Sequence, residues 1–238
     1  MQDTVITYLK ICFELITIAI LFWGALQAKR ATNIYYKQTK FQVARELGDR
    51  DNEIVEEIYR SSATSSFFAH YYPMTPRECA HKRIHMICQD CCGVPDWNTI
   101  AELEAWLFDY REFSDKSKVE LRKVFSLAQR ILYLMVRAWS AKHEGLLDED
   151  EYESWLTYID IVGTHPLFLV AVYYWHDMGY LIPGLARDIR TRLLHGDKAS
   201  FEEIEFIKIV YPEMVADDWV DKIGSVSVRD RMCRCSVD

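Results

Sequence analysis

Glycine and proline are scarce in this chain of 238 residues, which has nine glycines and six prolines. The phosphate-binding P-loop, the dinucleotide-binding fingerprint and the Gly-x-Ser-x-Gly turn of hydrolases are all missing from it. Alternating polar and apolar runs bounded by hairpin turns are missing as well. The chain therefore carries none of these common nucleotide-binding and hydrolase motifs. The lack of strand patterns predicts an all-α fold.

The cysteine pattern of secreted, disulfide-bonded proteins is also lacking. The chain has an odd number of cysteines, seven, and they are unevenly clustered, at Cys12, Cys79, Cys88, Cys91, Cys92, Cys233 and Cys235. This pattern argues against a secreted disulfide framework and favours a reducing compartment. Disorder is excluded too, because half of the residues are hydrophobic and 13% are aromatic.

Acidic residues are absent from one strip of the chain, residues 29–45, which carries Lys29, Arg30, Lys37, Lys40 and Arg45. The whole chain has a net charge of −8, so removing this strip of +5 leaves −13 on the remainder. An acidic domain of that kind is a poor electrostatic match for a nucleic-acid backbone. The basic strip is better explained by membrane topology and anionic lipid.

The longest apolar run, Val5 to Ala28, has only two charged residues, Lys10 and Glu14. At about 1.5 Å per residue it is roughly 36 Å long, enough for a hydrocarbon core of about 30 Å. We therefore predict that residues 1–28 form a transmembrane anchor. A core helix of a soluble protein is the alternative, although the run is long for one. A cleaved signal peptide fits poorly, because the first nine residues contain no Lys or Arg.

The basic strip also predicts the orientation of this anchor. Positive residues next to a span stay on the cytoplasmic side, so we expect a single-pass protein of the inner or plasma membrane with its N-terminus outside. Lys10 and Glu14 lie one helical turn apart and can pair near one interface. They can instead meet other helices in a homo-oligomer, because ionisable groups within a membrane are functional candidates.

Helical periodicity and helix-start signals organise the rest of the chain. We predict a basic helix over 29–47, a break at 48–53, an all-helical cytoplasmic domain over 48–224 and a loose tail over 225–238. Capping boxes begin helices at Thr75, Thr99 and Ser200. The predicted helices cover about 75–93, 99–113, 116–143, 148–162, 166–178, 183–195 and 201–210, and a last one runs from Pro212 toward Ile223.

The densest set of candidate metal ligands is His81, His85, Cys88 and Cys92, which fall on one stripe of a predicted helix. Zinc binds these residue types. A straight helix spreads the stripe over roughly 16 Å, so one ion would need further ligands, for which Cys233 and Cys235 are a source. A structural zinc is the only cofactor that the sequence suggests. The alternative is that the cysteines pack in the core and the histidines form hydrogen bonds.

A second candidate site is the Arg-x4-His motif of Arg190 and His195, which resembles the signature of HEPN-type ribonucleases. That resemblance implies a dimeric, metal-independent enzyme in which His195 takes part in proton transfer and Arg190 binds the scissile phosphate of RNA. Thr191 departs from the usual motif, where Asn, Asp or His is common. The alternative is that these are basic residues near the end of a helix, where the helix dipole favours them.

The chain has an N-terminal anchor, then a basic strip, then a helical domain. This order resembles that of uncharacterised bacterial single-pass membrane proteins, several of them linked to phage defence. Residues 131–159 carry most of the likeness, as a long helix, a Gly-Leu-Leu-Asp turn and an acidic amphipathic helix. One analogue in plan is the HEPN-type membrane accessory protein of type VI-B CRISPR systems, which forms a ring. The resemblance implies an assembly module acting at the membrane, with the lipid bilayer, other copies of itself and a cytoplasmic protein as partners. The alternative is a membrane-tethered ribonuclease.

Overall fold

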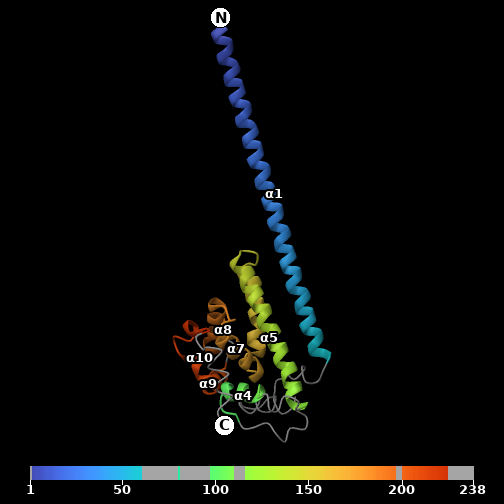
Figure 1. Cartoon of the computed structure of the whole chain (residues 1–238), viewed down its shortest axis with the longest axis vertical. Helices are drawn as coiled ribbons and strands as arrows, with labels where there is room; N and C mark the ends of the chain where they lie inside the picture. The colour runs from blue at the N-terminus through green and yellow to red at the C-terminus, as the bar shows by residue number, and fades with distance from the viewer. Residues whose placement is uncertain (1, 61–79, 81–96, 110–115, 197–199, 225–238) are drawn as a thin grey trace. The chain divides into compact units, whose positions relative to one another are not determined.

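A computed structural model describes residues 2–60, 80, 97–109, 116–196 and 200–224, with backbone alone for 2–20, 59, 116 and 117. The chain divides into two compact units, Met1–Glu46 and Leu47–Asp238. Every regular element formed by the described residues is a helix, and none of those residues forms a strand (Figure 1). The predicted all-α fold is therefore confirmed.

The first unit is part of one long helix, α1, which extends over Gln2–Arg60. Among the residues that the structure describes, no helix is both long and apolar enough to cross a membrane. The predicted span Val5–Ala28 lies mostly within residues 2–20, whose side chains are outside this description.

The predicted break at 48–53 is wrong, because α1 continues through it to Arg60. Gly48 and the polar residues that follow it are poor helix formers, which is why the sequence predicts an end there. The structure shows a buried stripe at Leu47, Ile54 and Ile58, each at most 8% exposed. The free energy gained by burying these side chains exceeds the cost of placing poor helix formers in the helix.

This stretch of α1 belongs to the second unit, and polar contacts hold it against two other helices of that unit. Asp51 accepts a hydrogen bond from the hydroxyl of Tyr158, and Glu57 forms an ion pair with Arg130. The guanidinium of Arg50 lies 5.5 Å from the ring centroid of Tyr133. These partners are far apart in the sequence, so local sequence patterns give no sign of them.

Two helical glycines give a matched stability test. A Cβ added at Gly48 meets nothing within 4 Å, whereas one added at Gly184 would lie 2.3 Å from Cζ2 of Trp139. We expect Gly48→Ala to raise the free energy of unfolding by about 0.5–1 kcal/mol, because alanine loses less backbone entropy in a helix. Gly184→Ala should lower it instead. Urea unfolding measures both, and destabilisation by Gly48→Ala would contradict a continuous helix.

The next helices that the structure describes in the second unit begin where the sequence predicts. They are α4 (Ile100–Leu107), α5 (Lys116–His143) and α6 (Glu149–Val162). The Thr99 capping box is present as predicted, with Glu102 closing it. This helix ends at Leu107, however, and does not reach residue 113. Phe108 leaves the helix and packs its ring 5.0 Å from that of Phe125, so a tertiary contact fixes the end.

The later helices are α7 (Pro166–Asp177), α8 (Pro183–His195), α9 (Phe201–Val210), α10 (Pro212–Val215) and a 3-10 turn, η3 (Val220–Lys222). The capping box of Ser200 is confirmed. The predicted helix from Pro212 to Ile223 is wrong, because α10 ends at Val215 and Ala216 is extended. The carbonyls of Met214 and Val215 accept hydrogen bonds from Arg190, which replace those that a longer helix would make.

The core of the second unit is centred on α7, which packs against α4 and α5. All six residues from Leu167 to Val172 have no exposed surface. Figure 1 shows α7 beside α5. A helix that is apolar nearly all round belongs in a core, as its sequence predicts.

A glycine pair fixes the end of α7 to the C-terminal turn. Gly179 and Gly224 both have φ values near +70°, and a Cβ on Gly179 would lie 3.3 Å from Cα of Gly224. The amide of Gly224 donates to the carbonyl of His176 at 2.8 Å, and the His176 ring stacks on Trp219 with centroids 4.7 Å apart. These contacts place the turn beside α8, where Arg190 lies.

Candidate functional site

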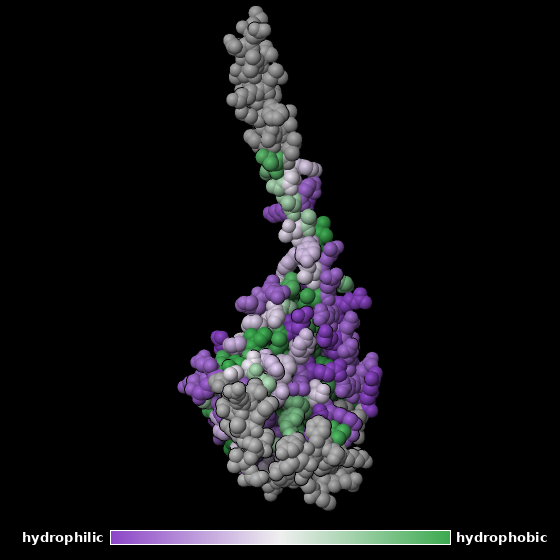
Figure 2. Space-filling view, in the orientation of Figure 1, coloured by the Kyte–Doolittle hydropathy of each residue, from purple (hydrophilic) through white to green (hydrophobic). Residues whose placement is uncertain are grey.

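The candidate site lies on α1, where an exposed apolar segment meets the basic strip. Leu21, Phe22 and Trp23 are 67%, 69% and 61% exposed. Large apolar side chains in a continuous group of this kind mark a binding surface. Figure 2 shows hydrophobic and hydrophilic side chains close together on this stretch of the helix.

Basic side chains follow at once and share a face with apolar ones. Lys29, Arg30 and Lys37 are all exposed. At 100° per residue, Trp23, Arg30, Ile34 and Lys37 fall within about 60° of one another, and we call these four residues the basic stripe. The boundary between the apolar segment and the positive charge therefore lies on one side of one helix.

Two of the predicted sites fall outside the described side chains. Lys10 and Glu14 lie in the part of α1 described by its backbone alone, and His81, His85, Cys88 and Cys92 lie in 81–96, which is not described. Within the described ranges, no three His, Cys, Asp or Glu residues are placed to hold one metal ion. The zinc site and the Lys10–Glu14 pair thus stay predictions.

Arg190 and His195 lie on different sides of α8. Five positions turn a helix by about 500°, which leaves the two side chains about 140° apart. The Arg190 Nε and Nη2 atoms donate to the carbonyls of Met214 and Val215 at 2.9 and 2.8 Å. His195 is exposed in the last turn of the helix. In this chain Arg190 links α8 to the end of α10, and the dipole of α8 favours the position of His195.

This arrangement predicts different effects for the two residues. Arg190→Met keeps the aliphatic packing but removes the donors, so we expect it to lower the free energy of unfolding by about 1–3 kcal/mol. His195→Ala should change it by less than about 0.5 kcal/mol, because the side chain is exposed. Urea unfolding of both variants tests this. Unchanged stability in Arg190→Met, together with RNA cleavage that both substitutions abolish, would favour the ribonuclease instead.

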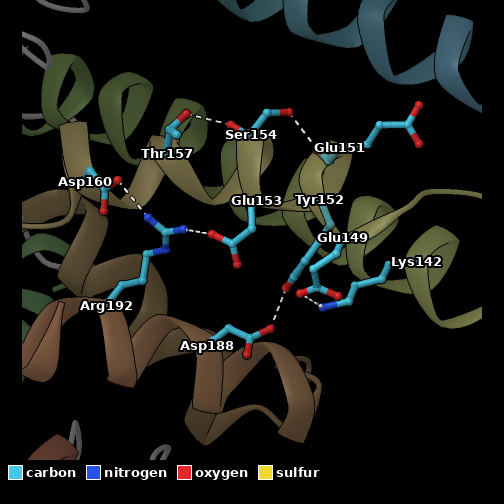
Figure 3. A network of polar contacts seen from close by, with 10 residues as sticks. All are labelled: Lys142, Glu149, Glu151, Tyr152, Glu153, Ser154, Thr157, Asp160, Asp188 and Arg192. Atoms are coloured by element: carbon cyan, nitrogen blue, oxygen red, sulfur yellow. Dashed lines mark hydrogen bonds and ion pairs between the residues drawn. The ribbon is translucent and has the colours of Figure 1, made fainter. Parts of the chain in front are cut away.

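A polar network between α6 and α8 was not predicted (Figure 3). Arg192 of α8 forms ion pairs with Glu153 and with Asp160, the latter at 2.8 Å. Beside it is a cavity of about 30 Å³ lined in part by Asp160, Thr164 and Arg192, large enough for one or two water molecules. The cavity is too small for a substrate. The ion pairs beside it join α6 to α8.

The same network includes Tyr152, whose hydroxyl and ring each have a charged partner. The hydroxyl of Tyr152 donates to Asp188 at 2.6 Å, and the Lys142 ammonium lies 4.3 Å from its ring centroid. Burial and the neighbouring Asp188 carboxylate raise the pKa of the Tyr152 phenol far above its usual value. Tyr152 therefore stays a neutral donor, which suits a structural contact and excludes a phenolate base near neutral pH.

An open groove of about 670 Å³ lies between the start of α8 and η3. Arg187, Arg190, Asp217 and Asp221 face it, so the charges of its lining cancel. The groove therefore favours neither an anion nor a cation, and the surface of α1 remains the stronger candidate.

Comparison with known proteins identifies no relative of this chain. No protein-family model, no curated protein and no solved structure matches it.

Proposed function

We propose that this protein is a membrane-anchored helical assembly module. Residues 5–28 of α1 cross the inner or plasma membrane once, with the N-terminus outside and the helical domain in the cytoplasm. Other copies of the chain and a cytoplasmic protein are its partners, and it acts at the membrane as an oligomeric effector of the kind found in bacterial defence.

One observation carries the anchor. Leu21, Phe22 and Trp23 are exposed on α1 and continue the apolar sequence 5–20, and the acid-free basic strip 29–45 begins six residues later. An apolar helix that ends in positive charge is typical of a span whose following segment stays in the cytoplasm. Trp23 lies five residues from the proposed end of the span, near the interfacial level where tryptophan is enriched.

Exposed residues farther along α1 support assembly. Ile34, Tyr35 and Phe41 are 58%, 71% and 69% exposed, on a stretch that would lie outside the hydrocarbon core. Large apolar and aromatic side chains that no described residue covers favour a protein–protein contact. The ribonuclease alternative gains no such support, since Arg190 binds main-chain carbonyls.

The mass of the particle extracted in mild detergent tests the assembly. Light scattering coupled to size exclusion should give a protein mass several times the 28.0 kDa of one chain. We expect Ile34→Ser combined with Phe41→Ser to reduce that mass. The matched control is Phe201→Ser with Ile209→Ser, which removes the same two residue types from exposed positions of the second unit. A monomeric wild-type chain would contradict the assembly.

A further inference from the structure

We propose that the basic stripe binds the headgroups of anionic phospholipids, so that the protein prefers negatively charged lipid as its partner. The inference rests on the proposed membrane anchor. It goes further in naming the lipid class and the side chains that select it, Arg30 and Lys37, with Lys29 beside them.

The helix places these cations at the right depth. If the span ends at Ala28, Arg30 lies about 3 Å and Lys37 about 14 Å farther along the axis. Headgroups occupy roughly 5–7 Å on each side of the hydrocarbon core. Arg30 therefore lies among them, and Lys37 lies within one Debye length, about 8 Å, of their outer edge.

The composition of the stripe explains why the occupant is anionic and lipidic. It holds two cations and no acid, and its other members, Trp23 and Ile34, are apolar and exposed. Parallel copies that meet through Ile34 would bring Arg30 near Arg30 and Lys37 near Lys37, and anionic headgroups reduce this repulsion. A lipid surface accepts both the charge and the apolar side chains, as basic amphipathic helices show.

The size of the preference follows from the charge count. A basic residue near an anionic surface contributes an energy that corresponds to roughly a fivefold gain in affinity. The gain falls as salt rises, because exposed charges are screened. We therefore expect a several-fold preference for an anionic lipid over a zwitterionic one at low salt and a smaller preference at high salt.

Electron spin resonance of spin-labelled lipids measures this preference on the full chain reconstituted in phosphatidylcholine vesicles. Spin-labelled phosphatidylglycerol should be immobilised by the protein more than spin-labelled phosphatidylcholine. The triple variant Lys29→Gln, Arg30→Gln and Lys37→Gln should bring the two lipids to equality. The control removes three exposed cations of the second unit, Lys123→Gln, Lys208→Gln and Lys222→Gln, and should keep the preference.

Each other outcome overturns the inference in a distinct way. Immobilised lipid with no preference in the wild type would reject the anionic partner and leave the anchor intact. A preference that survives in the triple variant would place the lipid contact on other residues. The absence of any immobilised lipid would reject the anchor itself, and with it the inference.

Discussion

Replacing Phe168 with alanine is expected to lower the free energy of unfolding by about 3–5 kcal/mol, the usual range for a buried Phe→Ala change. Phe168 has no exposed surface and lies on α7, which packs against α4 and α5. The loss combines the apolar surface no longer buried with a cavity that close packing cannot fill. Small domains have only about 5–15 kcal/mol of stability, so the variant should unfold at a much lower urea concentration.

The control for this result is the same substitution at an exposed position. Phe201 is 75% exposed at the start of α9, and Phe201→Ala should change the free energy of unfolding by less than about 0.5 kcal/mol. Circular dichroism followed through a urea titration measures both variants. Equal effects of the two substitutions would contradict the assignment of α7 as the centre of the core.

Placing two arginines in the apolar run is expected to remove the protein from the membrane. An arginine at the centre of a span costs about 2.5–3.5 kcal/mol on insertion scales. Ile16→Arg combined with Ile20→Arg should therefore shift the distribution between membrane and soluble fractions by three orders of magnitude or more, since each 1.4 kcal/mol is about tenfold. High-speed sedimentation of cell lysates followed by immunodetection measures the distribution.

The matched control makes the same two changes outside the span. Ile161 and Ile209 are exposed on α6 and α9, so Ile161→Arg with Ile209→Arg adds the same charge without affecting the proposed anchor. This variant should sediment with the membranes as the wild type does. If the Ile16 and Ile20 variant also stayed in the membrane fraction, residues 5–28 could not be what holds the protein there.

Much of the fold could be predicted because its signals are local. The helix over 116–143 was predicted with the bounds that α5 has, and the capping boxes of Thr99 and Ser200 are both present. These signals depend on residues three or four positions apart, which a single sequence displays directly. The core helix α7 was recognised because it is apolar nearly all round.

The misses came from contacts between distant residues. Gly48 lies inside α1 because the buried stripe and the Asp51–Tyr158 and Glu57–Arg130 contacts outweigh its low propensity. The helix predicted from Pro212 is interrupted after the four residues of α10, because Arg190 binds the last carbonyls of α10. No local pattern predicts partners that lie 24 or more positions away.

The candidate sites show the same limit. A short motif at Arg190 and His195 suggested catalysis, and the structure reveals main-chain partners for the arginine that no spacing rule could give. Lys118 illustrates the opposite case, because a lysine is expected at the surface but this one is completely buried, 4.8 Å from the Trp106 ring centroid. The α1 surface could be predicted because its apolar and basic residues are consecutive.

Alkaline carbonate extraction of membranes that contain the wild-type chain tests the anchor most directly. This treatment releases proteins held by surface charge, whereas a helix buried in the hydrocarbon core stays in the bilayer. We expect the full chain to remain in the membrane pellet and to float with lipid on a density gradient. Release of the chain into the supernatant would contradict the anchor on which the proposed function rests.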